Sequence, residues 1–304
     1  MRQWLIAVLA LLVLSAHAQD DDSVRLVDAR GVEVVLNKPA ARVISLAPHI
    51  TEIVYAAGAG EQLVGAVSYS DYPEAAKAVP RVGSYDNVNH EAVVSLAPDL
   101  VLAWRSGNGE EVARRLESFG LKVYVTEPRV LEDVATSLRH FGLLTGHREQ
   151  GEEQAGQFLA SLTRLREHYS RQQPVSVYYQ VWNEPMMTLN GEHLISDVLR
   201  LCGARNVFSD AQPMVLRISV ESVIRADPQV IIASGMGEAR PEWLDDWRIW
   251  TDMQAVHNQQ LYFVPPELLQ RHTPRIIQGA EQVCHFVEKA RRHYGSVVNA
   301  DQTE

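Results

Sequence analysis

The fold of this chain is indicated by a segment that occurs twice, Glu91-Ala-Val-Val-Ser-Leu-Ala-Pro-Asp-Leu-Val-Leu-Ala103 and Glu221-Ser-Val-Ile-Arg-Ala-Asp-Pro-Gln-Val-Ile-Ile-Ala233. The two copies align without a gap at an offset of 130 residues. Glu, Val, Pro and Ala coincide at four places, and the remaining apolar positions match in type. Each copy predicts a short helix, a turn marked by proline and a buried strand. The repeat therefore predicts two equivalent α/β lobes.

Short apolar runs extend this pattern along the chain. They cover residues 42–46, 63–67, 99–103 and 122–125 in the first half, and 175–181, 229–233 and 261–264 in the second. They alternate with helical patterns, which is typical of strand–helix units around mostly parallel sheets. A length of 304 residues agrees with two lobes, because a single hydrophobic core stops growing near this size.

A long helix is expected between the halves. Its segment lacks proline and places Phe158, Leu162 and Leu165 at helical spacing. About 22 residues make a rod of roughly 33 Å, which is long enough to span both lobes and to resist large hinge motion. We expect an N-terminal lobe at 19–148, the connecting helix at 149–171, a C-terminal lobe at 172–295 and a flexible tail at 296–304.

The first 18 residues have the pattern of an export signal. Arg2 is basic, Trp4 to Leu14 is apolar, and Ala16-His-Ala18 has the small-x-small cleavage pattern. The apolar run is short against the roughly 20 residues that a transmembrane anchor needs. Because no cysteine lies near the cleavage point, we expect a freely diffusing exported protein rather than a lipid-anchored one.

Composition and charge exclude several classes of function. Hydrophobic residues make up 46% of the chain and charged residues 22%, which is typical of a folded globular protein. The formal net charge of -10 argues against nucleic acid and against anionic membrane surfaces, because both require a basic face.

The chain contains two cysteines, Cys202 and Cys284. Outside the cytosol such a pair is more often bridged than free, although two buried thiols are the alternative. A bridge would close a loop of about 80 residues, contributing at most roughly 4.5 kcal/mol in the chain-entropy model. Their separation lacks the paired spacing of a zinc site.

Glu91 and Glu221 occupy the same place in the two copies of the repeat. Asn89 and Ser219 stand two residues earlier and are candidate N-caps, which places each glutamate in a first helical turn. The helix dipole favours a carboxylate there by about 0.3 to 1 kcal/mol, and this explains either glutamate alone. As a pair at one edge of two lobes, they would suit a partner with two-fold symmetry and two basic sockets.

Aromatic residues follow the ends of the expected strands or lie in the loop before Glu91; they are Tyr69, Tyr72, Tyr85, Trp104 and Trp182. Each one alone is more often a packing residue than a ligand contact. Several at successive strand ends suit a large planar ligand, which is held by stacking area and a few polar groups.

Four segments of the chain resemble a known family. They are Arg-Val-Ile-Ser-Leu-Ala-Pro-x-x-Thr-Glu (42–52), Ser-Tyr-Ser-Asp-Tyr-Pro (68–73), Ala-Pro-Asp-Leu-Val-Leu-Ala-Trp-Arg-x-Gly-Asn (97–108) and Thr-Pro-Arg-Ile-Ile (273–277). The chain resembles the periplasmic cobalamin-binding proteins of ABC importers over about residues 40 to 290. The first segment marks the wider family of iron-chelate and cobalamin binders, and the second and third are more specific to cobalamin binders.

The resemblance implies two α/β lobes joined by one rigid helix, with cobalamin or a related corrinoid in the cleft between them. It assigns ligand contacts to Tyr69, Tyr85 and Trp104 in the N-terminal lobe, and to Glu267, Arg271 and Val181 or Trp182 in the C-terminal lobe. In this family the cobalt keeps its own ligands, so we expect no protein–metal bond.

The resemblance also implies a partner and a disulfide. Glu91 and Glu221 match two family carboxylates that dock onto arginines of a dimeric permease, and Cys202 and Cys284 match a family disulfide. The free protein is expected to be a monomer.

Some positions depart from the family pattern. Tyr85 stands where some relatives have tryptophan, and the stretch 213–217 lacks an aromatic residue that is familiar there. The preferred corrinoid is therefore less defined than the fold. His49, His90 and His272 are expected to be solvated or hydrogen-bonded loop histidines rather than metal ligands.

Two alternative functions are the binding of an iron chelate and hydrolysis. Binding of haem or a ferric siderophore shares the fold and would need a Tyr or His ligand to iron or a basic cleft. An exported hydrolase is the enzyme alternative, but Gly-x-Ser-x-Gly, His-Glu-x-x-His, P-loop and dinucleotide fingerprints are absent from the sequence. We expect a binding protein, with no catalytic cofactor, that captures cobalamin and delivers it to an importer.

Overall fold

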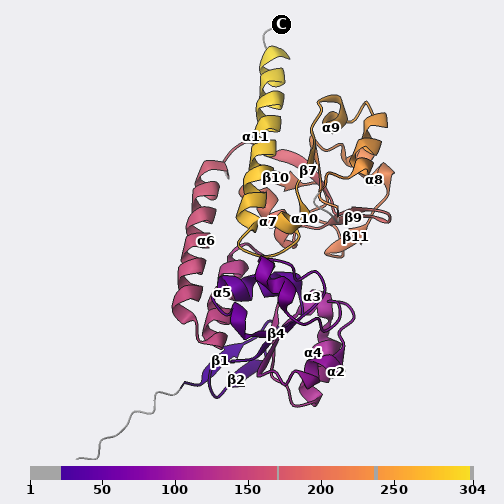
Figure 1. The fold of residues 1–304 in the computed structure, drawn as a ribbon. Coiled ribbons are helices and arrows are strands. Elements are labelled where there is room, and N and C mark those ends of the chain that lie inside the picture. Colours follow the sequence, from indigo (N-terminus) through magenta and orange to yellow (C-terminus); the bar gives the residue numbers. More distant parts are fainter. Residues whose placement is uncertain (1–21, 170, 236–238, 302–304) are drawn as a thin grey trace, which may run out of the picture.

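The computed structural model describes residues 22–169, 171–235 and 239–301. The expected signal peptide, residues 1–18, lies outside this part of the chain. Two α/β lobes stand one above the other, and the long helix α6 (Arg148–Tyr169) runs alongside both (Figure 1). The N-terminal lobe and the C-terminal lobe are residues 19–148 and 172–295, as proposed from the sequence.

The N-terminal lobe contains a four-stranded parallel sheet. Its strands, in spatial order, are β4 (Leu63–Ala66), β3 (Val43–Ser45), β5 (Leu100–Trp104) and β6 (Val123–Thr126). An antiparallel hairpin precedes it, formed by β1 (Val24–Val27) and β2 (Glu33–Leu36). Its helices are α1 (Pro48–Ala56), η1 (Gly60–Gln62), η2 (Glu74–Ala78), α2 (His90–Ser95), α3 (Arg105–Asn108), α4 (Glu110–Ser118) and α5 (Glu132–Thr145).

The C-terminal lobe repeats this architecture and adds a small sheet. Its parallel sheet has the order β10 (Ala204–Asn206), β7 (Val175–Gln180), β12 (Val230–Ala233) and β13 (Leu261–Phe263). The antiparallel addition is β11 (Val215–Arg217), β9 (Met186–Leu189) and β8 (Trp182–Asn183). Its helices are α7 (Leu194–Leu201), α8 (Val220–Ala226), η3 (Glu242–Ile249), α9 (Gln254–His257), α10 (Pro266–Leu269) and α11 (Ile276–Asp301).

All seven apolar runs of the sequence form strands of the two parallel sheets. The central strands are buried on both faces, as β12 is at each of its four residues, because helices cover both sides of such a sheet. The hairpin β1–β2 and the short antiparallel strands were not predicted. They are two to four residues long, which is too short for a clear periodic signal.

The repeat in the sequence is a repeat in the backbone. Asn89 accepts a hydrogen bond from Ala92 N at the start of α2, and Ser219 accepts one from Ser222 N at the start of α8, so both predicted N-caps are confirmed. At the turn that follows, Ala97 and Asp227 both have left-handed backbone, with φ of 43° and 40°. These positions are again 130 residues apart.

Helix α6 joins the lobes through packing on both. It contacts α5 and α1 of the N-terminal lobe and α7 and α11 of the C-terminal lobe. Its buried residues are Gly151, Ala155, Phe158 and Leu162, which recur at helical spacing on one face. A Cβ on Gly151 would stand 2.6 Å from Leu138 O of α5, so glycine is what permits this close crossing.

One cluster of buried apolar residues extends through both lobes. It includes Leu100 and Phe141 on one side, and Val177, Val198 and Val283 on the other. A core that is continuous across the boundary resists separation of the lobes, because opening would expose apolar surface at about 25 cal/mol per Å².

The two cysteines form a disulfide. Cys202 at the end of α7 is bonded to Cys284 in α11, with an S–S distance of 2.04 Å, and both are fully buried. The bond ties α7 to the last helix of the same lobe. That helix, α11, continues to Asp301, so the chain is helical over most of the segment that was expected to be a flexible tail. None of the helices in the described ranges is both long and apolar enough to cross a membrane.

Candidate functional site

The two lobes meet at a buried cluster of charges. Glu52 in α1 accepts hydrogen bonds from Arg271 Nη1 at 2.8 Å, from Arg275 Nε at 2.9 Å and from Arg275 Nη2 at 2.7 Å. The Glu52 side chain is 2% exposed, and those of Arg271 and Arg275 are 15% and 18% exposed. We call this contact the interlobe seam. The name also covers the residues described next, which are Tyr69, Asp71, Tyr72, Tyr85, Trp104, Asn108, His49, His193 and His272.

Arg271 also organises the loop that carries Tyr69. Its Nη1 donates to Asp71 Oδ1 at 2.7 Å and its Nη2 to Tyr69 O at 3.1 Å. Tyr69 has a φ of 64°, a left-handed conformation that costs energy for a residue with a side chain and persists where the surroundings hold it. Arg271 supplies one such constraint from the opposite lobe.

The charges at the seam stabilise one another. Burial alone would raise the pKa of Asp71, but the hydrogen bond and positive charge of Arg271 outweigh it, and the pKa is lowered. The Arg275 guanidinium lies 3.9 Å from the centre of the Tyr72 ring, a cation–π contact. Two carboxylates and two guanidiniums thus form a balanced group in which removal of one member leaves another buried and unpaired.

Trp104 lies at the seam against two histidines. Its ring centre is 5.0 Å from that of His49 and 6.2 Å from that of His272, both edge-on. His272 is 5.6 Å from His49 and 5.5 Å from His193. Trp104 itself is half-buried, so part of the indole is open to solvent.

The expectation that His49 and His272 are solvated or hydrogen-bonded loop residues was wrong. Both are buried, and His49 Nε2 and His272 Nδ1 have no hydrogen-bond partner in the described structure. Burial holds the pKa of His49 well below its usual value, and the charges of His272 and Arg271 add to this effect. Burial likewise lowers the pKa of His272 to about 4, against an opposing effect of Asp133.

The third histidine, His193, caps α7 and is also uncharged. Burial, with contributions from His272 and Arg129, lowers its pKa to about 3, and its Nδ1 accepts a hydrogen bond from Ile195 N. His49 and His272 therefore pack against Trp104, and His193 packs against His272.

Asn108 fixes the backbone at two aromatic residues of the N-terminal lobe, Trp104 and Tyr85. Its Oδ1 accepts from Trp104 N at 2.6 Å, and its Nδ2 donates to Tyr85 O at 2.6 Å and to Leu46 O at 2.8 Å. The rings of Tyr85 and Trp104 are 6.2 Å apart. Asn108 and Glu52 were not singled out as site residues, although both lie inside the quoted family motifs.

The structure brings some of the predicted ligand residues together and leaves others apart. Tyr85 and Trp104 are neighbours, and Arg271 contacts the backbone of Tyr69. Trp182 donates its indole N–H to Glu184 O within its own loop, and Glu267 lies half-buried in α10. Among the described residues, no ring contact or hydrogen bond joins Trp182 or Glu267 to Trp104. Val181 packs against the same large core cluster as Trp104.

Glu91 and Glu221 are both exposed in the first turns of α2 and α8. These helices belong to different lobes and lie on the side of the molecule away from α6 (Figure 1). The pKa of Glu221 is lowered by hydrogen bonds from the Ser219 side chain and from its own backbone. The Glu221 carboxylate is thus favoured as an anion at the surface.

The seam is suited to holding a planar organic molecule. It offers the exposed rings of Tyr69 and Tyr85 and part of Trp104 beside a few charged groups, and such a lining favours stacking with a small number of polar contacts. Within the described ranges, no group of three or more His, Cys, Asp or Glu side chains is placed to hold a metal ion.

Known proteins of similar sequence and structure agree on the kind of protein. Residues 43–268 match the family model described as periplasmic binding protein. The chain is 36% identical over 255 residues to the vitamin B12-binding protein of Vibrio cholerae, covering 84% of this chain and 91% of that one. It is 35% identical over 245 residues to the protein of that name from Yersinia pestis, covering 81% and 85%.

Solved structures share the architecture. The crystal structure of the periplasmic vitamin B12 binding protein BtuF of Vibrio cholerae has a TM-score of 0.78 and 35% identity, covering 83% of this chain and 98% of that one. The periplasmic heme-binding protein RhuT from Roseiflexus has a TM-score of 0.73 at 24% identity, covering 83% and 99%, and this second likeness concerns the fold alone.

Glu52→Gln is expected to lower the free energy of unfolding by about 3 kcal/mol, because it leaves the largely buried Arg275 guanidinium without its carboxylate and Arg271 with Asp71 alone. Urea unfolding at pH 7, followed by tryptophan fluorescence, measures this. The control is Glu74→Gln, which removes an ion pair to Lys77 from a side chain that is 85% exposed and should cost less than about 1 kcal/mol. Equal losses for the two variants would contradict the role of Glu52.

The free energy of unfolding should fall as the pH is lowered from 7 to 5. The unfolded histidines take up protons near pH 6.5 while the folded ones stay neutral, so the unfolded state binds more protons and is favoured. Each such histidine contributes about 1.4 kcal/mol per pH unit below 6.5. His272→Gln should make this dependence shallower, whereas His285→Gln, at an exposed position, should not. Urea unfolding at a series of pH values checks this, and an unchanged slope in His272→Gln would count against it.

Proposed function

This chain belongs to the family of periplasmic binding proteins, and from that premise we propose that it captures cobalamin in the periplasm and delivers it to an ABC importer of the inner membrane. The observation that carries the proposal is the group of rings at the interlobe seam, in a chain one-third identical to proteins named for vitamin B12 binding. The Tyr69 side chain is 76% exposed and that of Tyr85 is 43% exposed.

The corrin ring is held by apolar contact with these faces. Each Å² of apolar surface that the ligand and the rings remove from water contributes about 25 cal/mol before ordering costs. Those costs are small here, because Asn108 and Arg271 already fix the backbones of Tyr85, Trp104 and Tyr69. Stacking on preformed walls is the capture step.

The C-terminal lobe supplies the remaining contacts. Glu267 and Val181 or Trp182 face the ligand from that side, and Arg271 serves both the ligand and the seam. A guanidinium has five N–H groups, and the bonds to Glu52, Asp71 and Tyr69 use three of them. The others are available for an amide or phosphate oxygen of the ligand.

Delivery depends on the two exposed glutamates. Glu91 and Glu221 pair with one basic group on each subunit of a dimeric permease, which orients the loaded protein and raises the encounter rate more than the final affinity. The protein is a monomer when free, residues 1–18 direct its export and are cleaved, and it carries out no catalytic turnover.

Calorimetric titration with cyanocobalamin should give saturable binding, and haemin should give none. Trp104→Ala should weaken cyanocobalamin binding by about tenfold or more, because an anchoring ring at a stacking site typically contributes over 1 kcal/mol. Trp250→Ala, an exposed tryptophan outside the seam, is the control and should bind as the parent does. Binding of haemin with no response to cyanocobalamin would replace the proposal with haem binding.

Reversal of both docking charges should separate capture from delivery. The variant Glu91→Lys/Glu221→Lys is expected to keep its cyanocobalamin affinity and to lose uptake of labelled cyanocobalamin into proteoliposomes that contain the importer. The control Glu61→Lys/Glu149→Lys makes the same change of charge at two other exposed first-turn glutamates, and uptake should continue. Loss of ligand affinity in the first variant would contradict separate roles.

A further inference from the structure

We infer that the permease-docking surface consists of two matched units, each an exposed glutamate with an apolar pocket one helical turn away. Each unit accepts a basic side chain and a neighbouring apolar side chain from one permease subunit. The inference rests on the proposed docking function and adds the apolar half of the recognition.

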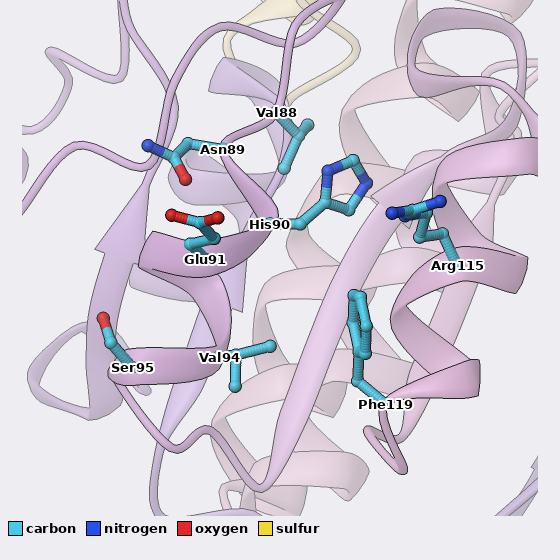
Figure 2. A pocket seen from close by; sticks show the side chains of 8 residues that line it. All are labelled: Val88, Asn89, His90, Glu91, Val94, Ser95, Arg115 and Phe119. Carbon is cyan, nitrogen blue, oxygen red and sulfur yellow. The ribbon is translucent and has the colours of Figure 1, made fainter.

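The N-terminal unit lies between α2 and the end of α4. A cavity of about 620 Å³ is lined there by Glu91, Val94, Arg115 and Phe119, among others. Figure 2 shows Val94 on α2 facing Phe119 across the pocket, with His90 and Arg115 above. Val94 is 43% exposed and Phe119 is 49% exposed, so the floor of the pocket is apolar and open to solvent.

The C-terminal unit lies beside α8, and its glutamate, Glu221, precedes the pocket along the helix without lining it. Ile224 occupies in α8 the position that Val94 occupies in α2, three residues after the glutamate and 130 residues along the chain. It lines a cavity of about 430 Å³ together with Ile249, Trp250 and Met253. Ile249 is 75% exposed and Trp250 is 40% exposed.

Helical spacing places each glutamate near a residue that lines its pocket. Residues three apart lie on the same face of a helix, so Glu91 is beside Val94 and Glu221 is beside Ile224. Of the eleven large hydrophobic side chains that are exposed in the described part of the chain, four line these two pockets. Exposed apolar side chains are thus concentrated at these two pockets.

Charge decides between a permease and a second copy of this chain. A second copy would bring glutamate against glutamate between molecules of net charge -10, which is repulsive. A partner with two identical subunits can instead place a cation and an apolar group on each unit. The other charges differ between the units, with Arg115 in one pocket and Asp227 and Asp252 in the other. The features that the units share, and that two identical subunits can bind in the same way, are the glutamate and the exposed apolar side chains.

The test uses the mature protein and the organism's own cobalamin importer in nanodiscs, with binding followed by biolayer interferometry. The variants Val94→Ser/Phe119→Ser and Ile249→Ser/Trp250→Ser should each weaken importer binding by about tenfold, the effect of losing buried apolar anchors. The control Val27→Ser/Val32→Ser removes side chains that are 59% and 44% exposed on the β1–β2 hairpin, away from both units, and should bind as the parent does.

Cyanocobalamin titration of every variant tests the proposed capture function separately. It also shows whether each variant is folded. If the parent binds cyanocobalamin and the pocket variants bind the importer as tightly as the control, the inference is overturned and the capture function stands. If the parent fails to bind cyanocobalamin, the capture function fails, whatever the importer result. Self-association of the parent in analytical ultracentrifugation that the pocket substitutions abolish would assign the surface to a second copy and would also overturn the inference.

Discussion

The carboxylate of Glu52 holds two arginines of the opposite lobe, and the geometry of the ligand side depends on that contact. Arg271 cannot reach Asp71 and the Tyr69 backbone unless the lobes have the spacing that the Glu52 contact requires. Because all the charged partners are at least half-buried except Asp71, the cluster has few alternative arrangements of low energy. One buried anion thus sets both the distance between the lobes and the conformation of an aromatic loop.

Around this anion the seam is apolar. His49 and His272, whose pKa values are lowered by burial, pack against Trp104, with His193 against His272, and the core cluster extends from one lobe to the other. Helix α6 and the shared core oppose wide opening, so the walls that meet a ligand are formed before it arrives. For a large planar molecule this is an advantage, because the ordering cost of binding falls when the site is preorganised. The packing of α6 and the shared core also favours a fixed distance between Glu91 and Glu221 on the outer face.

The repeated helix–turn–strand unit connects the interior to that outer face. In each lobe a capped helix carries an exposed glutamate in its first turn, is followed by a left-handed residue before proline, and leads into a largely buried strand of the parallel sheet. The buried strand anchors the unit, and the helix carries its acid and its apolar residue at the surface. In the proposed function the seam takes part in capture, and the repeat presents the two glutamates to a partner with two-fold symmetry.

The sequence by itself determined the parts that depend on local or periodic signals. Seven apolar runs became seven of the eight strands of the parallel sheets, with β10 unpredicted, Asn89 and Ser219 became N-caps, and the proline-free segment became α6. Such features are set by neighbours within a few residues, and a pattern can therefore reveal them. The motifs that resemble the cobalamin-binding family also contained Glu52 and Asn108, but nothing in the pattern assigned either residue a role.

Only the tertiary structure decided the seam and the docking pockets. Glu52 and Arg271 are 219 residues apart, and His49 meets His272 only because α1 and the segment between α10 and α11 come together. The histidines looked like isolated loop residues in the sequence, and burial made them a neutral packing surface. Val94 and Phe119 have no sequence relation that would pair them. Contacts between distant segments depend on how the elements pack, and local propensity carries no information about which surfaces will face each other.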